Sequence, residues 1–338
     1  MLATLLSATI SGITGRVVRV EVDVAPGLPG FTIVGLPDAA LSEARERVRG
    51  ALRNAGYHHP PRRITVNLAP AEVRKAGASL DLAIAMGILL GSEQLRAGGG
   101  RLALIGELGL GGEVRRVPGI LPMCLALERR GVTRVVVPAE ALGEASLARG
   151  IDPVPAASVA EAAELLRAPR TRRPRPQPLA RATTTIEDGL TRATDASPTG
   201  AAGVVDLADV RGQAVARRAL EIALAGGHAM LLLGPPGSGK TLLARTIPGL
   251  LPDLDDTAAL AATVVASATA SAPVETLVRR PPVRMPHHTT SYAGMVGGGP
   301  RLSPGEVTLA DQGVLFCDEL PEFGRDVLEA LRQPLEDG

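Results

Sequence analysis

The octapeptide GPPGSGKT at residues 234–241, together with what flanks it, constrains the fold more than any other stretch of this sequence. The apolar run AMLLL precedes it as a predicted strand, and TLLARTIPGLL follows it as a predicted helix. The octapeptide fits G-x-x-x-x-G-K-[ST] at every fixed position, and a strand–loop–helix context is the one in which such a loop cradles phosphates. We therefore expect an α/β module with a phosphate-binding loop in the second half of the chain.

Each residue type in this loop has a physical task. Glycines let the backbone bend so that successive N–H groups point at an anion, and the helix N-terminus adds partial positive charge. Lys240 is expected to reach the β and γ phosphates of ATP, and the Thr241 hydroxyl to ligate Mg²⁺. A plain glycine-rich turn does not explain Lys240, because lysine occurs only twice in the chain, at Lys75 and Lys240, against 34 arginines. The predicted cofactor-binding residues are Gly234, Pro235, Pro236, Gly237, Ser238, Gly239, Lys240 and Thr241.

A second stretch supplies the complementary groups. VLFCDE at residues 314–319 has four apolar residues, which predict a buried strand, and two acids at the end of that strand. Asp318 is expected to join Thr241 as a metal ligand, holding the Mg²⁺ through its water. Glu319 is expected to polarise the attacking water, so that Glu319 and Lys240 are the predicted catalytic residues. An Asp-Glu pair after an apolar run is a weak signal alone, but together with the predicted phosphate-binding loop at 234–241 it indicates a nucleotide site.

Residues 1–168 alternate between strand-like and helix-like patterns and are expected to form a mixed α/β domain. Asp38 is placed to cap a helix that ends at Gly56. SLDLAIAMGILL, residues 79–90, is apolar nearly all round and predicts a buried helix. The other predicted strands are RVVRVEVDV (16–24), FTIVG (31–35), RITVNLA (63–69), RLALIGEL (101–108) and RVVVP (134–138), and the other predicted helices are ILPMCLALERRG (120–131) and SVAEAAELLRA (158–168).

A basic, proline-rich stretch separates the two halves. From Ala168 to Gly203 there are five prolines, six arginines and three acids, with no apolar period, so residues 169–203 are predicted to be a partly extended linker. Such a linker could contact DNA phosphates or serve as a solvated tether. The predicted organisation is a first domain at 1–168, this linker, and a second module at 204–338.

Composition narrows the classes of partner. The net charge is +1, so any binding of nucleic acid must come from local patches of charge. Aromatic residues total 1% and tryptophan is absent, which nearly excludes extended stacking platforms for single-stranded bases. The N-terminus lacks the features of a signal peptide, and no apolar run reaches the roughly 18 residues of a membrane-spanning helix. We expect a cytoplasmic protein, with Cys124 and Cys317 as buried free thiols.

Eight longer strings carry a resemblance to the YifB/ComM group of magnesium-chelatase-like AAA+ ATPases. In the first half they are GFTIVGLPDAALSEARERVRGAL, PPRRITVNLAPAEVRKAG and IGELGLGGEVRRVPGILP; in the second half they are DLADVRGQ, GPPGSGKT, MPHHTTSYAGMVGGGP, PGEVTLADQGVLFCDELPEF and VLEALRQPLEDG. The resemblance implies a Lon-protease-like α+β domain followed by a P-loop AAA+ α/β module. It also implies a hexameric ring of identical subunits and, in the ComM branch, ATP-driven branch migration on branched or single-stranded DNA.

The resemblance to Lon raises the question of peptidase activity. Lon-type proteolysis uses a serine and a lysine a little over forty residues apart, which places Ser79 at the nucleophile position and Leu121 at about the base position. Leu121 cannot accept a proton, and Lys75, four residues before Ser79, is in the wrong place. A serine without its base is a weak nucleophile, so the domain is expected to dock partners or subunits and not to cleave peptides.

The stretch MPHHTTSYAGMVGGGPRLSPGE, residues 285–306, looks like the inserted hairpin loop that ring ATPases of this kind point toward their central channel. The adjacent His287 and His288 do not share a strand face and lack the i, i+4 spacing of helical metal ligands, so a zinc site is not expected there. A structural loop and a DNA-facing loop both remain open.

The family module continues past the final EDG with a sensor strand, an arginine finger and a helical lid. The sensor strand would lie between the strand before the loop and the strand at 314–319. Its absence would leave unpaired backbone groups, at about 1–3 kcal/mol each. From the sequence we therefore expect an incomplete AAA+ module that retains nucleotide-binding residues and lacks full catalysis. Two alternatives stay open: a partner-binding Lon-like module with a vestigial ATPase remnant, and an ATPase subunit of a magnesium chelatase.

Overall fold

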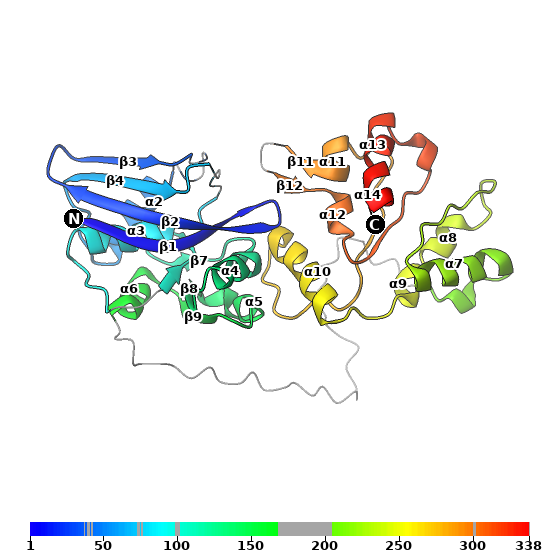
Figure 1. The fold of residues 1–338 in the computed structure, drawn as a ribbon, viewed down its shortest axis with the longest axis horizontal. Coiled ribbons are helices and arrows are strands. Elements are labelled where there is room, and N and C mark those ends of the chain that lie inside the picture. The colour runs from blue at the N-terminus through cyan, green and yellow to red at the C-terminus, as the bar shows by residue number, and fades with distance from the viewer. Residues whose placement is uncertain are drawn as a thin grey trace, which may run out of the picture. The chain divides into compact units, whose positions relative to one another are not determined.

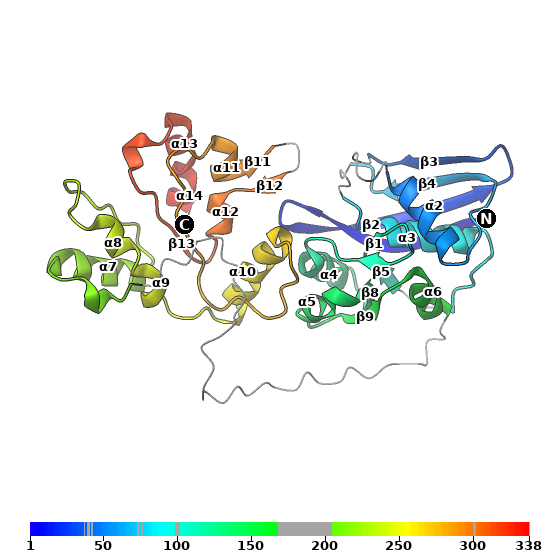
Figure 2. The same cartoon turned by 180° about the vertical axis from the view of Figure 1, so that it is seen from behind.

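The computed structural model describes residues 1–167 and 205–337, apart from positions 37, 39, 40, 42, 73, 74, 76, 99–101, 300 and 301. The predicted linker at 169–203 lies outside these residues. Contacts divide the chain into two compact units, one of Met1–Ala196 with Ser267–Thr276 and one of Ser197–Ala266 with Leu277–Gly338. Each unit is taken by itself below, with the ribbon seen from two sides (Figures 1 and 2).

A seven-stranded mixed sheet organises the first unit. Its strands run in the order β3-β4-β2-β1-β5-β8-β9. Four neighbouring pairs are parallel, and the pairs β1–β2 and β2–β4 are antiparallel, so the α/β class predicted from the sequence is confirmed. The strands are β1 (Leu2–Ser11), β2 (Thr14–Ala25), β3 (Gly30–Val34), β4 (Arg63–Ala69), β5 (Leu102–Leu104), β8 (Arg134–Pro138) and β9 (Asp152–Ala156), with a separate hairpin of β6 (Glu107–Leu108) and β7 (Val114–Arg115).

Alternation predicted most of these strands. In β2 the inward positions Val18, Val20, Val22 and Val24 are buried, while Arg19 on the other face is exposed. β4 spans the predicted residues, and the predicted strand at 101–108 is divided between β5 and β6. Strands β1 and β9 were not predicted from the sequence. LATLLSATIS in β1 has too little alternation, and DPVPA in β9 carries two prolines, which in sheets favour edge positions such as this one.

Helices cover the sheet, four of them at predicted places. These four are α2 (Ala44–Asn54), α3 (Asp81–Gly91), α4 (Ile120–Arg129) and α6 (Val159–Arg167), and a short fifth helix, α5 (Leu142–Ser146), was not predicted. Asp38 Oδ1 accepts a hydrogen bond from the Leu41 backbone N–H at 2.8 Å, as a capping residue does, but the continuous part of α2 begins only at Ala44. Gly56 ends the helix as predicted, with a left-handed φ of 82°.

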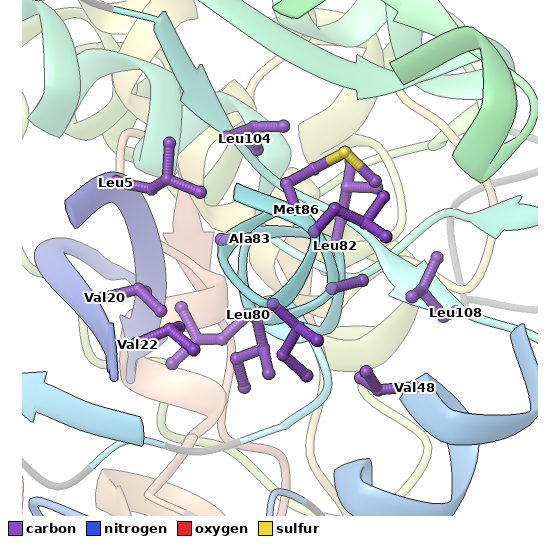
Figure 3. Close-up of a cluster of buried hydrophobic side chains, with 14 of the residues drawn as sticks. Leu5, Val20, Val22, Val48, Leu80, Leu82, Ala83, Met86, Leu104 and Leu108 are labelled. Carbon is purple, nitrogen blue, oxygen red and sulfur yellow. The ribbon is translucent and has the colours of Figure 1, made fainter. Parts of the chain in front are cut away.

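Helix α3 is the centre of the first unit's core. Ten of its eleven residues are buried, which confirms the predicted buried helix. Figure 3 shows Leu82, Ala83 and Met86 of this helix in one cluster with Val20 and Val22 of β2, Val48 of α2 and Leu104 of β5. Gly87 lets the helix approach the sheet closely, since a Cβ added there would lie 2.5 Å from Val22 Cγ2. Apolar packing of this kind supplies most of a domain's stability.

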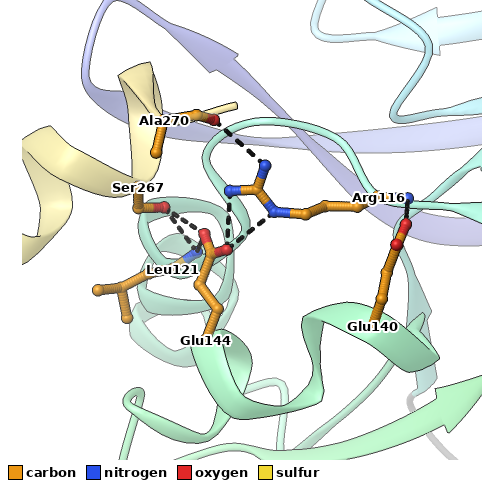
Figure 4. A network of polar contacts seen from close by, with 6 residues as sticks. All are labelled: Arg116, Leu121, Glu140, Glu144, Ser267 and Ala270. Atoms are coloured by element: carbon orange, nitrogen blue, oxygen red, sulfur yellow. Dashed lines mark hydrogen bonds and ion pairs between the residues drawn. The ribbon is translucent and has the colours of Figure 1, made fainter. Parts of the chain in front are cut away.

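A buried polar network ties a distant segment into the same unit (Figure 4). The Glu144 carboxylate accepts from the Arg116 guanidinium at 3.0 and 3.1 Å and from the Ser267 hydroxyl at 2.5 Å. Arg116 also donates to the Ala270 carbonyl oxygen at 3.2 Å. Because the Glu144 and Arg116 side chains are 0% and 8% exposed, the ion pair needs all these partners to offset the loss of hydration.

The second unit has less regular structure. Its helices are α7 (Ala214–Gly226), α8 (Lys240–Ala244), α9 (Ile247–Leu250), α10 (Asp256–Thr269, whose residues from Ser267 onward are counted in the first unit), α11 (Tyr292–Val296), α12 (Glu306–Leu309), α13 (Arg325–Ala330) and α14 (Arg332–Asp337). Its strands form two pairs, β10 (Val283–Arg284) with β13 (Val314–Leu315) and β11 (Gly297–Gly298) with β12 (Ser303–Pro304). The single helix predicted after the loop is divided into α8 and α9.

The strand predicted at residues 229–233 is not formed, which corrects the sequence-based expectation. A strand exists only through its ladder partners, and residues 229–233 have none within the described part of the chain, because β10 pairs with β13 alone there. Leu231 and Leu233 are 66% and 85% exposed, whereas Met230 and Leu232 pack against a small core with Leu243 and Phe316. The predicted strand at 314–319 shortens to Val314–Leu315.

Two further expectations can be compared with the structure. Cys124 and Cys317 are both free thiols, but only Cys124 is buried, and burial raises its pKa to about 12. None of the helices formed by the described residues combines the length and the apolar character needed to cross a membrane.

Candidate phosphate-binding site

The loop GPPGSGKT connects residues 229–233 to helix α8. Gly237 and Gly239 have φ values of 78° and 86°, in the left-handed region that a residue with a Cβ enters only at a cost, and Gly239 is the N-cap of α8. These two glycines let the backbone after Gly234 form a tight turn before helix α8 begins. Pro235, Pro236 and Ser238 form the rest of the turn, and all eight predicted residues lie together in one exposed or half-buried loop.

Lys240 lies across the start of its own loop. Its ammonium group donates to the carbonyl oxygens of Gly234 at 2.9 Å and Pro235 at 3.1 Å. An ammonium has three donors, so these two bonds leave one N–H for an anion held in the loop. The lysine side chain thus lies against the backbone at the start of its loop.

Thr241 and Asp318 meet although they are 77 positions apart in sequence. The Thr241 hydroxyl donates to Asp318 Oδ2 at 2.6 Å. Helix α8 supplies the threonine from its second residue, and the segment after β13 supplies the aspartate. Hydroxyl and carboxylate oxygens are the hard donors that Mg²⁺ prefers. Since the hydroxyl proton points at Asp318, its lone pairs are free for a cation, and the two residues fit the predicted metal site.

Glu319 is held by contacts that the sequence did not predict. Its backbone is left-handed, with φ of 54°, and its N–H donates to Asp318 Oδ1 at 3.0 Å. The Glu319 side chain is 65% exposed, and its Oε2 lies 3.3 Å from His288 Nδ1. The imidazole therefore contacts the carboxylate expected to act on water.

Two residues near the site were missed by sequence reasoning. Gln213, left-handed at the N-cap of α7, donates from its side-chain amide to the Ser238 carbonyl oxygen at 3.0 Å and so braces the loop. His288 was considered only as a metal ligand. The signal for Gln213 was its place in DLADVRGQ, one of the strings that carry the family resemblance. His288 lies in MPHHTTSYAGMVGGGP, another of these strings, but nothing local pairs it with Glu319, which lies 31 positions further along the chain.

The glycine-rich stretch after His288 contains the short hairpin β11–β12. The rings of His287 and His288 lie with centroids 4.1 Å apart, and His287 Nδ1 is 2.9 Å from Thr289 Oγ1. Among the described residues no group of three His, Cys, Asp or Glu side chains is suited to hold a metal ion. The two histidines therefore contact a hydroxyl and a carboxylate at the edge of the candidate site.

In the first unit, the serine and lysine considered for peptidase chemistry are bonded to backbone groups. Ser79 is 4% exposed and donates to the Ala8 carbonyl oxygen at 3.0 Å. Lys75 is fully buried and donates to the carbonyl oxygen of Pro70. Leu121, at the expected base position, is buried in α4, and its backbone N–H faces Glu144. These contacts are those of structural residues in the packing of the unit.

Comparison with protein families gives two matches that together cover most of the described chain. The family described as "Magnesium chelatase, subunit ChlI" matches residues 206–338, which contain the whole candidate site. The family described as "Subunit ChlI of Mg-chelatase" matches residues 20–141 in the first unit.

Curated relatives align along nearly the whole chain. An uncharacterized protein of Mycobacterium tuberculosis strain H37Rv is 45% identical over 337 residues, covering 98% of this chain and 63% of the relative. The uncharacterized protein YifB of Escherichia coli K12 is 42% identical, covering 97% of this chain and 61% of YifB. The competence protein ComM of Haemophilus influenzae is 40% identical, covering 100% of this chain and 64% of ComM. The chain thus spans somewhat less than two thirds of the length of these relatives.

Proposed function

The chain belongs to the YifB/ComM family of magnesium-chelatase-like proteins, and from this premise we propose that its second unit binds ATP with Mg²⁺. Gly234–Thr241 hold the phosphates, Lys240 neutralises the β and γ phosphates, and Thr241 with Asp318 holds the cation. Glu319 is the group that polarises water for hydrolysis in the whole protein. Bound Mg²⁺ would draw charge from the phosphates and orient the γ-phosphoryl group.

The contact between Thr241 and Asp318 carries this proposal. The loop motif alone predicts a bend that can accept phosphate, but a nucleotide site also needs a carboxylate beside the threonine that follows the lysine. The 2.6 Å bond between the two side chains supplies that carboxylate. It supports ATP with Mg²⁺ over a metal-free anion site, because the added negative charge would repel an anion that came without a cation.

Equilibrium binding of a fluorescent ATP analogue in the presence of Mg²⁺ tests the proposal. Lys240→Ala removes the ammonium group, and we expect binding at least about tenfold weaker, from the loss of a charge-assisted contact of about 1.5–3 kcal/mol. Asp318→Asn should remove most of the Mg²⁺ dependence of binding. The control is Arg325→Ala, which removes a positive charge whose side chain is 93% exposed. Unchanged binding by the Lys240→Ala variant contradicts the site.

The role proposed for the whole protein is ATP-driven remodelling or branch migration of DNA by a hexameric ring of this polypeptide in the cytoplasm. Its support is the family and the name of one relative, competence protein ComM. We further propose that the first unit is a Lon-like domain, that 169–203 links it to an AAA+ module at 204–338, and that the first unit docks partners or subunits. ATP-dependent movement of a labelled four-way DNA junction tests this role.

A second candidate function follows from the family descriptions, both of which name a subunit of magnesium chelatase. In that case ATP would drive insertion of Mg²⁺ into a porphyrin together with partner subunits. Porphyrin metallation by the protein with those subunits would favour this function, and junction movement without them would favour the DNA-remodelling role.

A further inference from the structure

A small basic hollow lies at the end of helix α2 in the first unit. Its cavity of about 260 Å³ is lined by Arg49, Arg53, Tyr57, His58 and His59. Arg49 and Arg53 are one helical turn apart, so their side chains lie on the same face of α2. Both are exposed, and neither forms an ion pair with a carboxylate of the described residues.

The turn after α2 is fixed, so the hollow has a defined shape. Gly56 donates to the Arg53 carbonyl oxygen at 3.1 Å, and Tyr57 donates to the Leu52 carbonyl oxygen at 2.9 Å. These bonds satisfy terminal carbonyls of the helix, whose partial negative charge would otherwise oppose an anion. Gln94 clamps His58 from both sides, accepting from its N–H at 2.9 Å and donating to its carbonyl oxygen at 2.7 Å.

Planar rings gather at the same place. The chain has only five Phe and Tyr residues, and two of them, Phe31 and Tyr57, lie here. Phe31 stacks on His59 with ring centroids 6.2 Å apart. His59 Nε2 is buried and has no hydrogen-bond partner among the residues that the structure describes, and burial, followed by the nearby Arg49, lowers the pKa of this imidazole. His59 is thus a half-buried ring in a stack.

The local charge is far from that of the whole chain. From Arg47 to Ala71 there are five arginines and two histidines and no Asp or Glu, whereas the 338 residues together carry a net charge of +1. Glu46, directly before this stretch, is one acid whose charge also acts on His59. Arg47 is engaged with buried Asp81 at 2.7 Å and does not contribute to the hollow. The guanidinium group of arginine can form two parallel hydrogen bonds to the oxygens of a phosphate. A planar ring beside it can stack on a nucleic-acid base.

We propose that this hollow binds the backbone of single-stranded nucleic acid, with Arg49 and Arg53 on a phosphate and the ring of Tyr57 against the neighbouring base. The cavity is below the roughly 300–1,000 Å³ of pockets for drug-sized ligands, so it takes one nucleotide unit of a longer strand. Guanidinium groups bind either phosphates or carboxylates, but the rings can stack only on the bases of a nucleic acid. The combination therefore favours nucleic acid over an acidic peptide. The inference rests on the proposed action on DNA and locates a contact for it.

Binding of a fluorescein-labelled oligothymidine to the full chain tests this site by anisotropy, without ATP. An oligonucleotide of about 20 residues exceeds the roughly 4–16 nucleotides of many single-strand sites. We expect Arg49→Glu/Arg53→Glu to weaken binding at least about tenfold and to lower the slope of log affinity against log salt by about 0.7, the value for the one phosphate that the pair contacts. Arg129→Glu/Arg130→Glu is the matched control, because both arginines are exposed in the same unit and the charge change is identical.

Two further variants separate stacking from charge. Tyr57→Ala should weaken binding roughly tenfold, whereas Tyr57→Phe, which keeps the ring, should bind like the parent chain. Arg49→Gln/Arg53→Gln, a milder pair, covers the case in which the glutamate variant fails to fold, as judged by circular dichroism. Equal weakening by the pocket pair and the control pair would overturn the proposal, because it would show diffuse attraction. Competition by polyglutamate as strong as that by unlabelled oligothymidine would also overturn it, in favour of an acidic peptide.

The two binding assays distinguish failure of the proposed nucleic-acid site from failure of the proposed ATP site. Loss of fluorescent-ATP binding in Lys240→Ala with oligothymidine binding intact supports both sites as separate features. If the Arg49/Arg53 variants bind oligothymidine like the parent chain while Lys240→Ala loses ATP binding, the proposal for the hollow is wrong and the proposed ATP site is supported.

Discussion

Helix α3 of the first unit and residues 229–233 of the second are both strongly apolar segments, yet they end in opposite environments. Ten of eleven residues of α3 are buried beneath the sheet and α2. In the segment before the phosphate loop, Leu231 and Leu233 remain 66% and 85% exposed. Hydrophobicity sets how much a segment gains from burial, but the neighbours that bury it come from elsewhere in the fold.

The difference in burial between the two units bears on which of them can bind a ligand. The first unit obtains its stability from one continuous core, and its polar groups that could react are held by backbone carbonyls or by each other. In the second unit the candidate site consists of exposed or half-buried loops joined by a few side-chain bonds, such as Thr241 to Asp318. Loops held in this way can adjust around a ligand, while a core built like that around α3 cannot.

The largest expected effect comes from truncating one leucine in each segment. Leu82→Ala in α3 removes a fully buried side chain and should lower the free energy of unfolding of the first unit by about 2–5 kcal/mol. Leu233→Ala should change the second unit by no more than about 0.5 kcal/mol, because the side chain already meets water.

Each unit contains one of the chain's two tyrosines, Tyr57 in the first and Tyr292 in the second. Denaturant titrations followed by tyrosine fluorescence, in chains with one or the other replaced by phenylalanine, therefore report on each unit separately. Equal destabilisation by Leu82→Ala and Leu233→Ala would remove the contrast between the two segments.

The next effect concerns pH and the buried pair Asp81–Arg47. Burial raises the pKa of Asp81 from 3.8 to about 6, although the hydrogen bond from Arg47 acts in the other direction. Between these two pKa values the folded state binds more protons than the unfolded state, so the stability of the first unit should fall as pH rises from about 4 to about 6. The change from this one group is on the order of 3 kcal/mol, at about 1.4 kcal/mol per pKa unit.

Asp81→Asn removes the titrating group. The difference in unfolding free energy between parent and variant should therefore change across this pH range, and stability measured at closely spaced pH values checks it. Parallel curves for the two proteins would show that Asp81 does not titrate differently on folding.

The smallest effect distinguishes two ion pairs within the second unit. Arg284 on β10 contacts Glu306 on α12 at 2.7 and 2.9 Å in a two-pronged geometry, with side chains only 17% and 21% exposed. A double-mutant cycle with alanine at both positions should give a coupling of about 1 kcal/mol. The control cycle at Arg325 and Glu329, 93% and 71% exposed, should give about 0.3–0.5 kcal/mol. A larger coupling at the exposed pair would contradict the ranking by burial.

Sequence patterns correctly predicted the elements that are determined by neighbouring residues or by a regular repeat of apolar positions. The alternation in β2 and β4, the apolar surface of α3 and the stop at Gly56 each depend on a few neighbouring residues. The loop at 234–241 and the Asp-Glu pair at 318–319 were recognised because their chemistry requires those residue types at fixed spacing.

What sequence reasoning missed depends on contacts between distant parts of the chain. The strand predicted at 229–233 had the right composition but no ladder partner in the described chain, and β9 was hidden by its prolines. The bonds of Gln213 to Ser238 and of His288 to Glu319 join residues 25 and 31 positions apart, and neither pairing follows a period. The Arg116–Glu144–Ser267 network spans more than 120 positions and could be found only from the fold.

The two lysines have a practical consequence for chemical labelling. Lys75 is fully buried in the first unit, while Lys240 is half-buried in the phosphate loop. An amine-reactive ester applied to the native protein should therefore modify Lys240 and the terminal amine of Met1, and mass spectrometry can use the terminal amine as an internal reference. Shielding of Lys240 by a nucleotide would then appear as a change in a single acylation site, without a radioactive or fluorescent ligand.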